Sequence, residues 1–336
     1  MRIEPPLTWS SGLLSWEPSV WDGLVVLLAV GYLAGVIMCR RRGGRWPLWR
    51  VWCFLGGLVA FAVAVNSAVG VYSDVLFSVH MVQHLTLIML VPVLLAFGHP
   101  MSLWVAAAAS PERARSRERI LGSRLVGWVT HPAPAFVFYA AVLIGTHLTS
   151  FLQFRLENPG LEHVEIALYL VSGYLLFVSV VGGEPIRWRR VPYLLRVVLL
   201  MVGMLPDTLV GVVLMMTPRP VAPAFAAAHP GWGPTLAADQ QLAGAIMWFF
   251  GDAGMAALAV FVVGLWLRSS GSDAGLGTWL ESARSSALSQ TADGGSAALP
   301  GGAADVDSDD ALAAYNAMLA RLNEEPGRGG AGERAR

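Results

Sequence analysis

The chain has 336 residues, of which 55% are hydrophobic and 14% are charged; its net charge is zero and its mean hydropathy is +0.56. Soluble domains carry about 25% charged residues, so this composition predicts a protein that crosses a membrane several times. All 23 basic residues are arginine, which excludes enzymes that need a Schiff-base lysine or a P-loop lysine. No basic patch predicts a nucleic-acid partner, and two cysteines, Cys39 and Cys53, are too few for a disulfide framework.

Seven stretches are apolar enough to cross a hydrocarbon core of about 30 Å as helices. They cover residues 21–39, 50–68, 75–97, 133–151, 163–182, 193–216 and 241–267. The residues before them, 1–20, lack the basic region and cleavage site of a signal peptide. The expected fold class is therefore an all-α integral membrane protein, a seven-transmembrane helix bundle.

Arginine is concentrated in alternate connections between these spans. The first, third and fifth connections are rich in it, whereas the second has none, the fourth has only Arg155 and the sixth has only Arg219. Positive residues accumulate on the cytoplasmic side, which predicts an external N-terminus and a cytoplasmic C-terminus. We expect an extracytoplasmic segment at 1–20, a membrane domain at 21–267 and a flexible, low-complexity cytoplasmic tail at 268–336.

Polar residues within the spans gather near the predicted outer face. The third span begins with His80, Gln83 and His84, whose spacing puts them on one face of a helix. His147 ends the fourth span, and His163 begins the fifth. Because polar groups inside a membrane are costly, such a cluster indicates a functional site.

The residue types in this cluster favour a metal. Imidazole suits copper, zinc, iron and nickel, and methionine thioether favours Cu(I). A His-xxx-His pair can hold one ion from two points, and a third ligand from another span can complete the site. The predicted metal-binding residues are His80, His84, His147, His163, Met215, Met216 and Asp239, with copper as the expected ion.

Each of these residues also has a structural interpretation. The histidines can hydrogen-bond to neighbouring helices, and the methionines can fill gaps in the core. Asp239 can cap the start of the seventh span. Asp207, which follows Pro206, can bind a proton or an ion, or it can bond to backbone groups freed by the proline; Asp252 is equally open.

Three segments resemble one family. His80-Met81-Val82-Gln83-His84-Leu85, continuing through Pro92 to Gly98-His99-Pro100, is similar to the signature of the multi-pass CtaG family of bacterial cytochrome c oxidase assembly proteins. Asp239-Gln240-Gln241-Leu242-Ala243-Gly244-Ala245-Ile246-Met247-Trp248 resembles a second signature of that family, and Gly173-Tyr174-Leu175-Leu176-Phe177, leading to Glu184-Pro185, a third. The resemblance covers about residues 21–267, nearly all of the expected membrane domain.

The resemblance implies a role in forming the copper centres of a haem–copper oxidase in the bacterial plasma membrane. It suggests His80 and His84 as motif histidines, with oxidase subunits, copper and the lipid bilayer as partners. His163 does not align with the family pattern without an offset.

Three functions remain open at this point. The first is a copper-binding assembly factor that passes its ion to an oxidase subunit. The second is a b-type haem or quinone redox protein, with His84 and His147 as haem ligands. The third is a metal-free membrane scaffold or a transporter. No hydrolytic triad or phosphate-binding loop is present, so we do not expect an enzyme.

Overall fold

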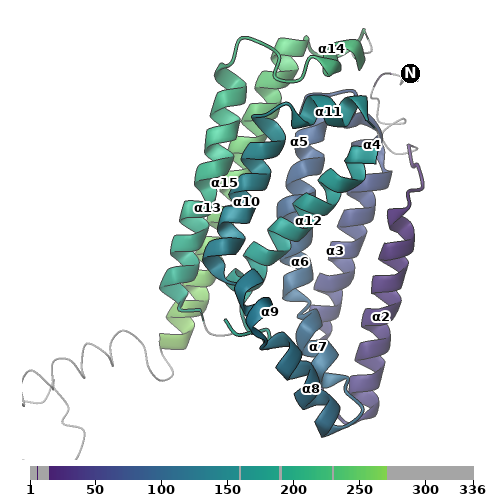
Figure 1. Cartoon of the computed structure of the whole chain (residues 1–336), viewed down its shortest axis with the longest axis vertical. Coiled ribbons are helices and arrows are strands. Elements are labelled where there is room, and N and C mark those ends of the chain that lie inside the picture. Colours follow the sequence, from purple (N-terminus) through teal and green to yellow (C-terminus); the bar gives the residue numbers. More distant parts are fainter. Residues whose placement is uncertain (1–5, 7–14, 159, 189–190, 229–230, 271–336) are drawn as a thin grey trace, which may run out of the picture. The chain divides into compact units, whose positions relative to one another are not determined.

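The computed structural model describes residues 6, 15–158, 160–188, 191–228 and 231–270 (Figure 1). The chain divides into two units, Met1–Val263 and Gly264–Arg336, and the first unit contains every site discussed below. Most of the expected N-terminal segment and the tail beyond residue 270 lie outside the described residues.

Every regular element among the described residues is a helix, as the composition predicts. Six stretches are long and apolar enough to cross a membrane: α2 (Trp21–Arg41), α3 (Leu48–Asn66), Phe77–Ala106, α12 (Gly160–Val181), α13 (Tyr193–Met216) and α15 (Leu236–Ser270). A seventh span requires α10 (Pro132–His147) and α11 (Phe151–Glu157) to be counted together, although they are bent by 63°. The all-helical membrane class is confirmed, with six or seven spans, and the orientation of the termini stays a prediction.

Shorter helices connect these spans. They are α4 (Ala68–Tyr72), α8 (Pro111–Leu121), α9 (Arg124–Val129) and α14 (Ala224–Ala228). Helices α11 and α14 lie at one end of the bundle, and α8 and α9 lie at the other (Figure 1).

The third span, expected as one helix over 75–97, runs from Phe77 to Ala106 and is broken into four pieces. They are α5 (Phe77–Leu85), the π-helix η1 (Thr86–Leu90), α6 (Val91–Phe97) and α7 (Pro100–Ala106). Pro92 has no N–H to donate to the carbonyl of Ile88, and the chain passes this point through the wider π-helical turn. A second break follows at His99, which has a left-handed backbone with φ of 49°.

The start of the third span is held by a carboxylate from another helix. Asp239 of α15 accepts hydrogen bonds from the backbone N–H of Phe77 at 2.6 Å and of Ser78 at 3.2 Å, and from the Ser78 hydroxyl at 2.5 Å. These are free donors at the start of α5, so Asp239 caps α5. The expectation that Asp239 caps its own helix is wrong, because Thr235 accepts from the Ala238 N–H at the start of α15.

A second carboxylate holds the break at His99 in the same way. Glu184, which follows α12, accepts from the backbone N–H of Met101 at 3.1 Å and of Ser102 at 2.7 Å, and from the Ser102 hydroxyl at 2.5 Å. The broken third span is therefore fixed at two helix starts by acidic residues that lie far away in the sequence.

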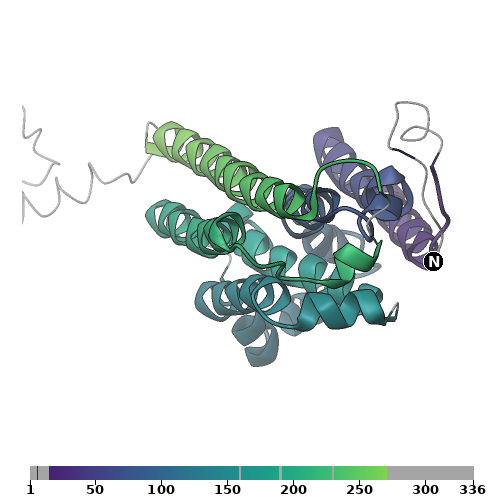
Figure 2. The ribbon, with the colours of Figure 1, turned by 90° about the horizontal axis from the view of Figure 1, so that it is seen from above.

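The third span occupies the middle of the bundle. Its α6 segment packs between α3 and α12 (Figure 1). A Cβ atom at Gly173 of α12 would lie 1.9 Å from the carbonyl oxygen of Ile88 and 2.8 Å from Pro92, so only glycine fits against the π-helical turn. Helices α13 and α15 run side by side (Figure 2) and approach closely at Gly211 and Gly244.

We predict that Gly173→Ala lowers the stability of the bundle, because the new methyl group overlaps the Ile88 carbonyl. A destabilisation of about 1–3 kcal/mol or more is expected for such overpacking. The matched control is Gly145→Ala, also inside a helix, where a Cβ meets nothing within 4 Å. Thermal unfolding of both variants in detergent checks this, and equal midpoints would contradict the close approach.

We also predict that Asp239→Ala destabilises the protein by about 1–3 kcal/mol, because it leaves three donors at the start of α5 without an acceptor. Asp239→Asn should lose less, because an amide oxygen still accepts hydrogen bonds at a helix start. Chemical unfolding in detergent measures both changes. Similar losses in the two variants would show that the charge, rather than capping, is what matters.

Candidate metal centre

Three buried imidazoles meet at the end of the bundle where α11 and α14 lie. His80 and His84 stand one helical turn apart on α5, and His147 is the last residue of α10. The His84 and His147 rings are 4.6 Å apart between centroids, and the His80 and His147 rings are 5.9 Å apart. All three side chains are no more than 1% exposed. The structure thus unites three of the histidines that the sequence singled out.

Most of the ring nitrogens in this cluster lack a hydrogen-bond partner among the described residues. These are both nitrogens of His80, both nitrogens of His84 and Nε2 of His147. A buried polar atom without a partner costs about 1–3 kcal/mol. Concentration of such atoms in one place is the signal of a ligand site, since nitrogen lone pairs stay available there.

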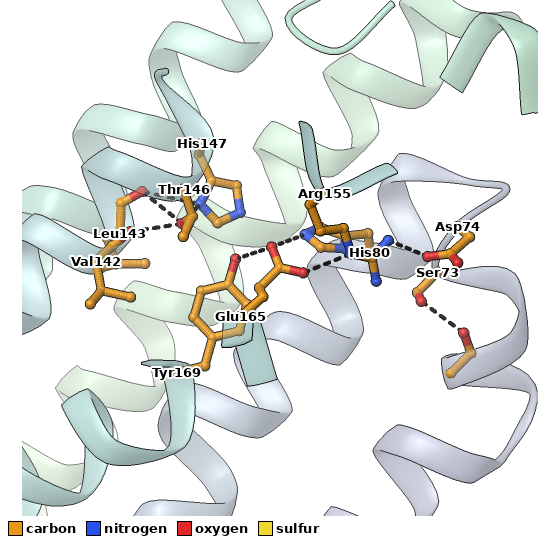
Figure 3. A network of polar contacts seen from close by, with 11 residues as sticks. Ser73, Asp74, His80, Val142, Leu143, Thr146, His147, Arg155, Glu165 and Tyr169 are labelled. Carbon is orange, nitrogen blue, oxygen red and sulfur yellow. Dashed lines mark hydrogen bonds and ion pairs between the residues drawn. The ribbon is translucent and has the colours of Figure 1, made fainter. Parts of the chain in front are cut away.

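His147 is oriented for binding through one nitrogen. Its Nδ1 lies 3.1 Å from the carbonyl oxygen of Leu143 and 2.8 Å from the Thr146 hydroxyl (Figure 3). A carbonyl oxygen can only accept, so Nδ1 carries the proton and Nε2 presents its lone pair. This is the arrangement by which metal-binding histidines are usually held, with one nitrogen bonded to the protein and the other facing the ion.

A buried carboxylate borders the histidines. Glu165 of α12 has Oε1 at 3.7 Å from Nε2 of His80 and accepts a 2.9 Å hydrogen bond from the Tyr169 hydroxyl (Figure 3). Its Oε2 lies 3.0 Å from Nε of Arg155, and Arg155 also pairs with Asp74. Tyr169 in turn packs its ring edge-to-face with His84 at 4.4 Å.

The cluster is covered by the two short helices. Gln153 of α11 accepts a hydrogen bond from the Ala224 N–H of α14 at 2.9 Å. Phe225 of α14 stacks on Phe77 at 5.1 Å and faces the His80 ring at 6.5 Å. This cover separates the imidazoles from the aqueous surface.

The other predicted metal-binding residues lie elsewhere. His163 is exposed and accepts a 3.2 Å hydrogen bond from the Trp21 indole N–H. Met216 is 77% exposed, and Met215 lies against Gly244 of α15. Both carboxylate oxygens of Asp239 are engaged in capping α5.

The described residues fit a metal in chemistry and not yet in arrangement. Neutral imidazole nitrogens and a carboxylate oxygen are suitable donors for copper or zinc. However, among the residues described, no three His, Cys, Asp or Glu side chains already surround a common metal position.

Sequence reasoning missed Glu165, Tyr169 and Arg155. Two signals could have found them. Glu165 is an acidic residue within an apolar span and stands one turn from Tyr169, while Arg155 is the single arginine in an otherwise arginine-free connection.

A second polar cluster lies deeper in the bundle. The Tyr139 hydroxyl donates to Asp207 at 3.1 Å, and the Thr208 hydroxyl donates to Asp252 at 2.8 Å. Tyr139 stands two turns before His147 on α10. Asp207 therefore bonds to a neighbouring helix rather than to backbone freed by Pro206.

Comparison with known proteins gives relatives of similar sequence and no solved structure that matches. Uncharacterized proteins of Mycobacterium bovis and Mycobacterium tuberculosis are each 33% identical over 279 residues, which cover 80% of this chain and 42% of theirs. One from Mycobacterium leprae is 31% identical over 264 residues, covering 74% of this chain and 40% of its own. The chain thus spans about two fifths of the length of these relatives.

The sequence profile of one family covers most of the bundle. It matches residues 30–269, from α2 to the end of α15, and so includes all three imidazoles and their carboxylate neighbour. The chain belongs to the cytochrome c oxidase caa3 assembly factors, the Caa3_CtaG family.

Proposed function

We propose that this assembly factor binds copper at the three-histidine cluster and passes it to an oxidase subunit. The observation that carries the proposal is that five ring nitrogens of His80, His84 and His147 lie in one buried place with no hydrogen-bond partner among the described residues. Copper is cargo here rather than a resident cofactor. Few ligands and a movable cover suit an ion that must be released.

Each histidine has a distinct part in this function. His80 and His84 offer two donors from one face of α5, whose start is fixed by Asp239. His147 offers Nε2 from a second helix, with its tautomer set by the Leu143 carbonyl. The proposed function consists of binding copper and releasing it, and it includes no covalent reaction step.

The proposed location is the plasma membrane of a bacterium, with the cluster on the outer side. The arginine distribution supports this orientation, because the connections next to the cluster are poor in arginine. The family supports an oxidase subunit as the recipient.

We predict that the double variant His80→Ala/His84→Ala lowers copper in the oxidase without lowering the abundance of the assembly factor. Removing two of three ligands should reduce copper bound to the purified factor from about one ion per chain to a trace. Mass spectrometry of metals in both proteins, with an absorption spectrum of the factor, measures the effect.

The matched control is His163→Ala, since that histidine is exposed and bonded to Trp21. It should leave copper in both proteins unchanged. Normal oxidase copper in the double variant would reject delivery by this site, and iron with a Soret band in the wild type would favour the haem function instead.

A further inference from the structure

We propose that Glu165 is a further ligand of the cluster and that Arg155 stands in the place of the cargo cation until a divalent ion displaces it. This inference rests on the proposed copper function. It adds that the bound ion is divalent and that displacement of Arg155 controls its entry. It is built on the contacts between α5, α11 and α12 (Figure 3).

The first step is the distance between two donors. Oε1 of Glu165 is 3.7 Å from Nε2 of His80, and both side chains are buried. Bonds from a metal to imidazole nitrogen and to carboxylate oxygen are about 2.0–2.2 Å long, so one ion can bridge donors separated by up to about 4 Å. The pair is already close enough to share an ion, whereas it is too far apart for a good hydrogen bond.

The second step concerns the charge of Glu165. A buried carboxylate needs a cation or several donors, and the charged group beside it is Arg155, at 3.0 Å. Arg155 is itself only 2% exposed, and its Nη2 has no hydrogen-bond partner among the described residues. The Arg155 guanidinium is buried, yet within the described part of the chain it does not use all of its hydrogen-bond donors. Its main contribution beside Glu165 is therefore its positive charge.

The third step is that Arg155 has a second anion available. It also pairs with Asp74, whose side chain is 56% exposed. Arg155 can therefore give up Glu165 and keep its charge paired at the surface. Because α11 is seven residues long and sharply bent from α10, a small movement of this helix moves Arg155 and opens the cover together.

The donor set selects the class of cation. Imidazole nitrogen with a carboxylate oxygen suits Cu(II) or Zn(II), whereas Cu(I) prefers sulfur ligands. Met215 and Met216 lie away from the cluster, against α15 and at the surface respectively. The site is thus that of a divalent ion, whose charge also competes better with a guanidinium than a monovalent ion does.

Titration of the purified full chain in detergent with Cu(II) and Zn(II), against a chelator of known affinity, tests the exchange. Glu165→Gln should weaken binding by about tenfold or more, because it removes an anionic ligand. Arg155→Gln should tighten binding by about tenfold or more, because it removes the competing cation. Arg155→Lys keeps the charge and should bind as the wild type does.

Tighter metal binding by Arg155→Gln together with weaker binding by Glu165→Gln would support the exchange. Weaker binding by both variants would overturn it. The double variant Arg155→Gln/Glu165→Gln has no unpaired buried charge, so it keeps the test valid if Arg155→Gln does not fold. It should bind no more tightly than Glu165→Gln, and tighter binding would exclude Glu165 as a ligand. The paramagnetic resonance spectrum of bound Cu(II) should change in Glu165→Gln; an unchanged spectrum would also overturn the proposal.

The possible outcomes distinguish failure of this inference from failure of the proposed copper function. If the wild type binds copper and loses it in His80→Ala/His84→Ala while Glu165→Gln has no effect, the copper function stands and this inference falls. Binding of Cu(I) with no affinity for Cu(II) or Zn(II) also overturns the divalent site alone. No binding of any of these ions by the wild type or Arg155→Gln overturns both.

Discussion

The nine-residue helix α5 carries two of the three imidazoles, and the geometry of the cluster depends on how its ends are held. Asp239 of α15 caps the start of this helix by accepting hydrogen bonds from the backbone N–H groups of Phe77 and Ser78. The π-helical turn η1 ends it, and Gly173 of α12 presses against that turn. Residues from two other spans therefore set the position of His80 and His84 within the bundle. In a hydrocarbon medium such breaks persist only where the surrounding helices satisfy the freed backbone groups.

The same requirement explains the polar residues of the family motifs. Asp239 and Glu184, which are far apart in the sequence, each begin a segment of the broken span by accepting two backbone bonds and one hydroxyl bond. The carbonyl oxygen of Gly98, next to the left-handed His99, accepts a 2.7 Å hydrogen bond from the Tyr32 hydroxyl of α2. These positions build the scaffold of the site, whereas the histidines of α5 have ring nitrogens that no such role uses.

Much of the fold follows from the sequence, and the site follows only in part. Apolar length predicts the spans, and the uneven distribution of histidine predicts that His80, His84 and His147 lie at one end of the bundle. Hydropathy does not predict the breaks in the third span, because it takes no account of the N–H that Pro92 lacks or of the left-handed backbone of His99. Arg155 and Glu165 were missed as a pair, since their contact joins two helices across a connection whose path no local pattern reveals. His163 lies near the start of α12, two residues before Glu165, but its side chain bonds to Trp21 instead of joining the cluster. Closeness in the sequence is misleading here.

Burial of the histidine cluster limits how fast a bound ion could leave it. Three imidazoles with at most 1% exposure cannot exchange an ion with a partner protein unless part of the cover moves. Helices α12, α13 and α15 run over many turns, whereas α11 and α14 are short and are joined by the Gln153–Ala224 hydrogen bond. Local opening is drawn from elements with few buried contacts, and α11 and α14 are the short helices that lie over the cluster. In the proposed exchange, opening the cover would also move Arg155 away from Glu165, because Arg155 belongs to α11; access to the cluster and electrostatic competition for Glu165 would then change together.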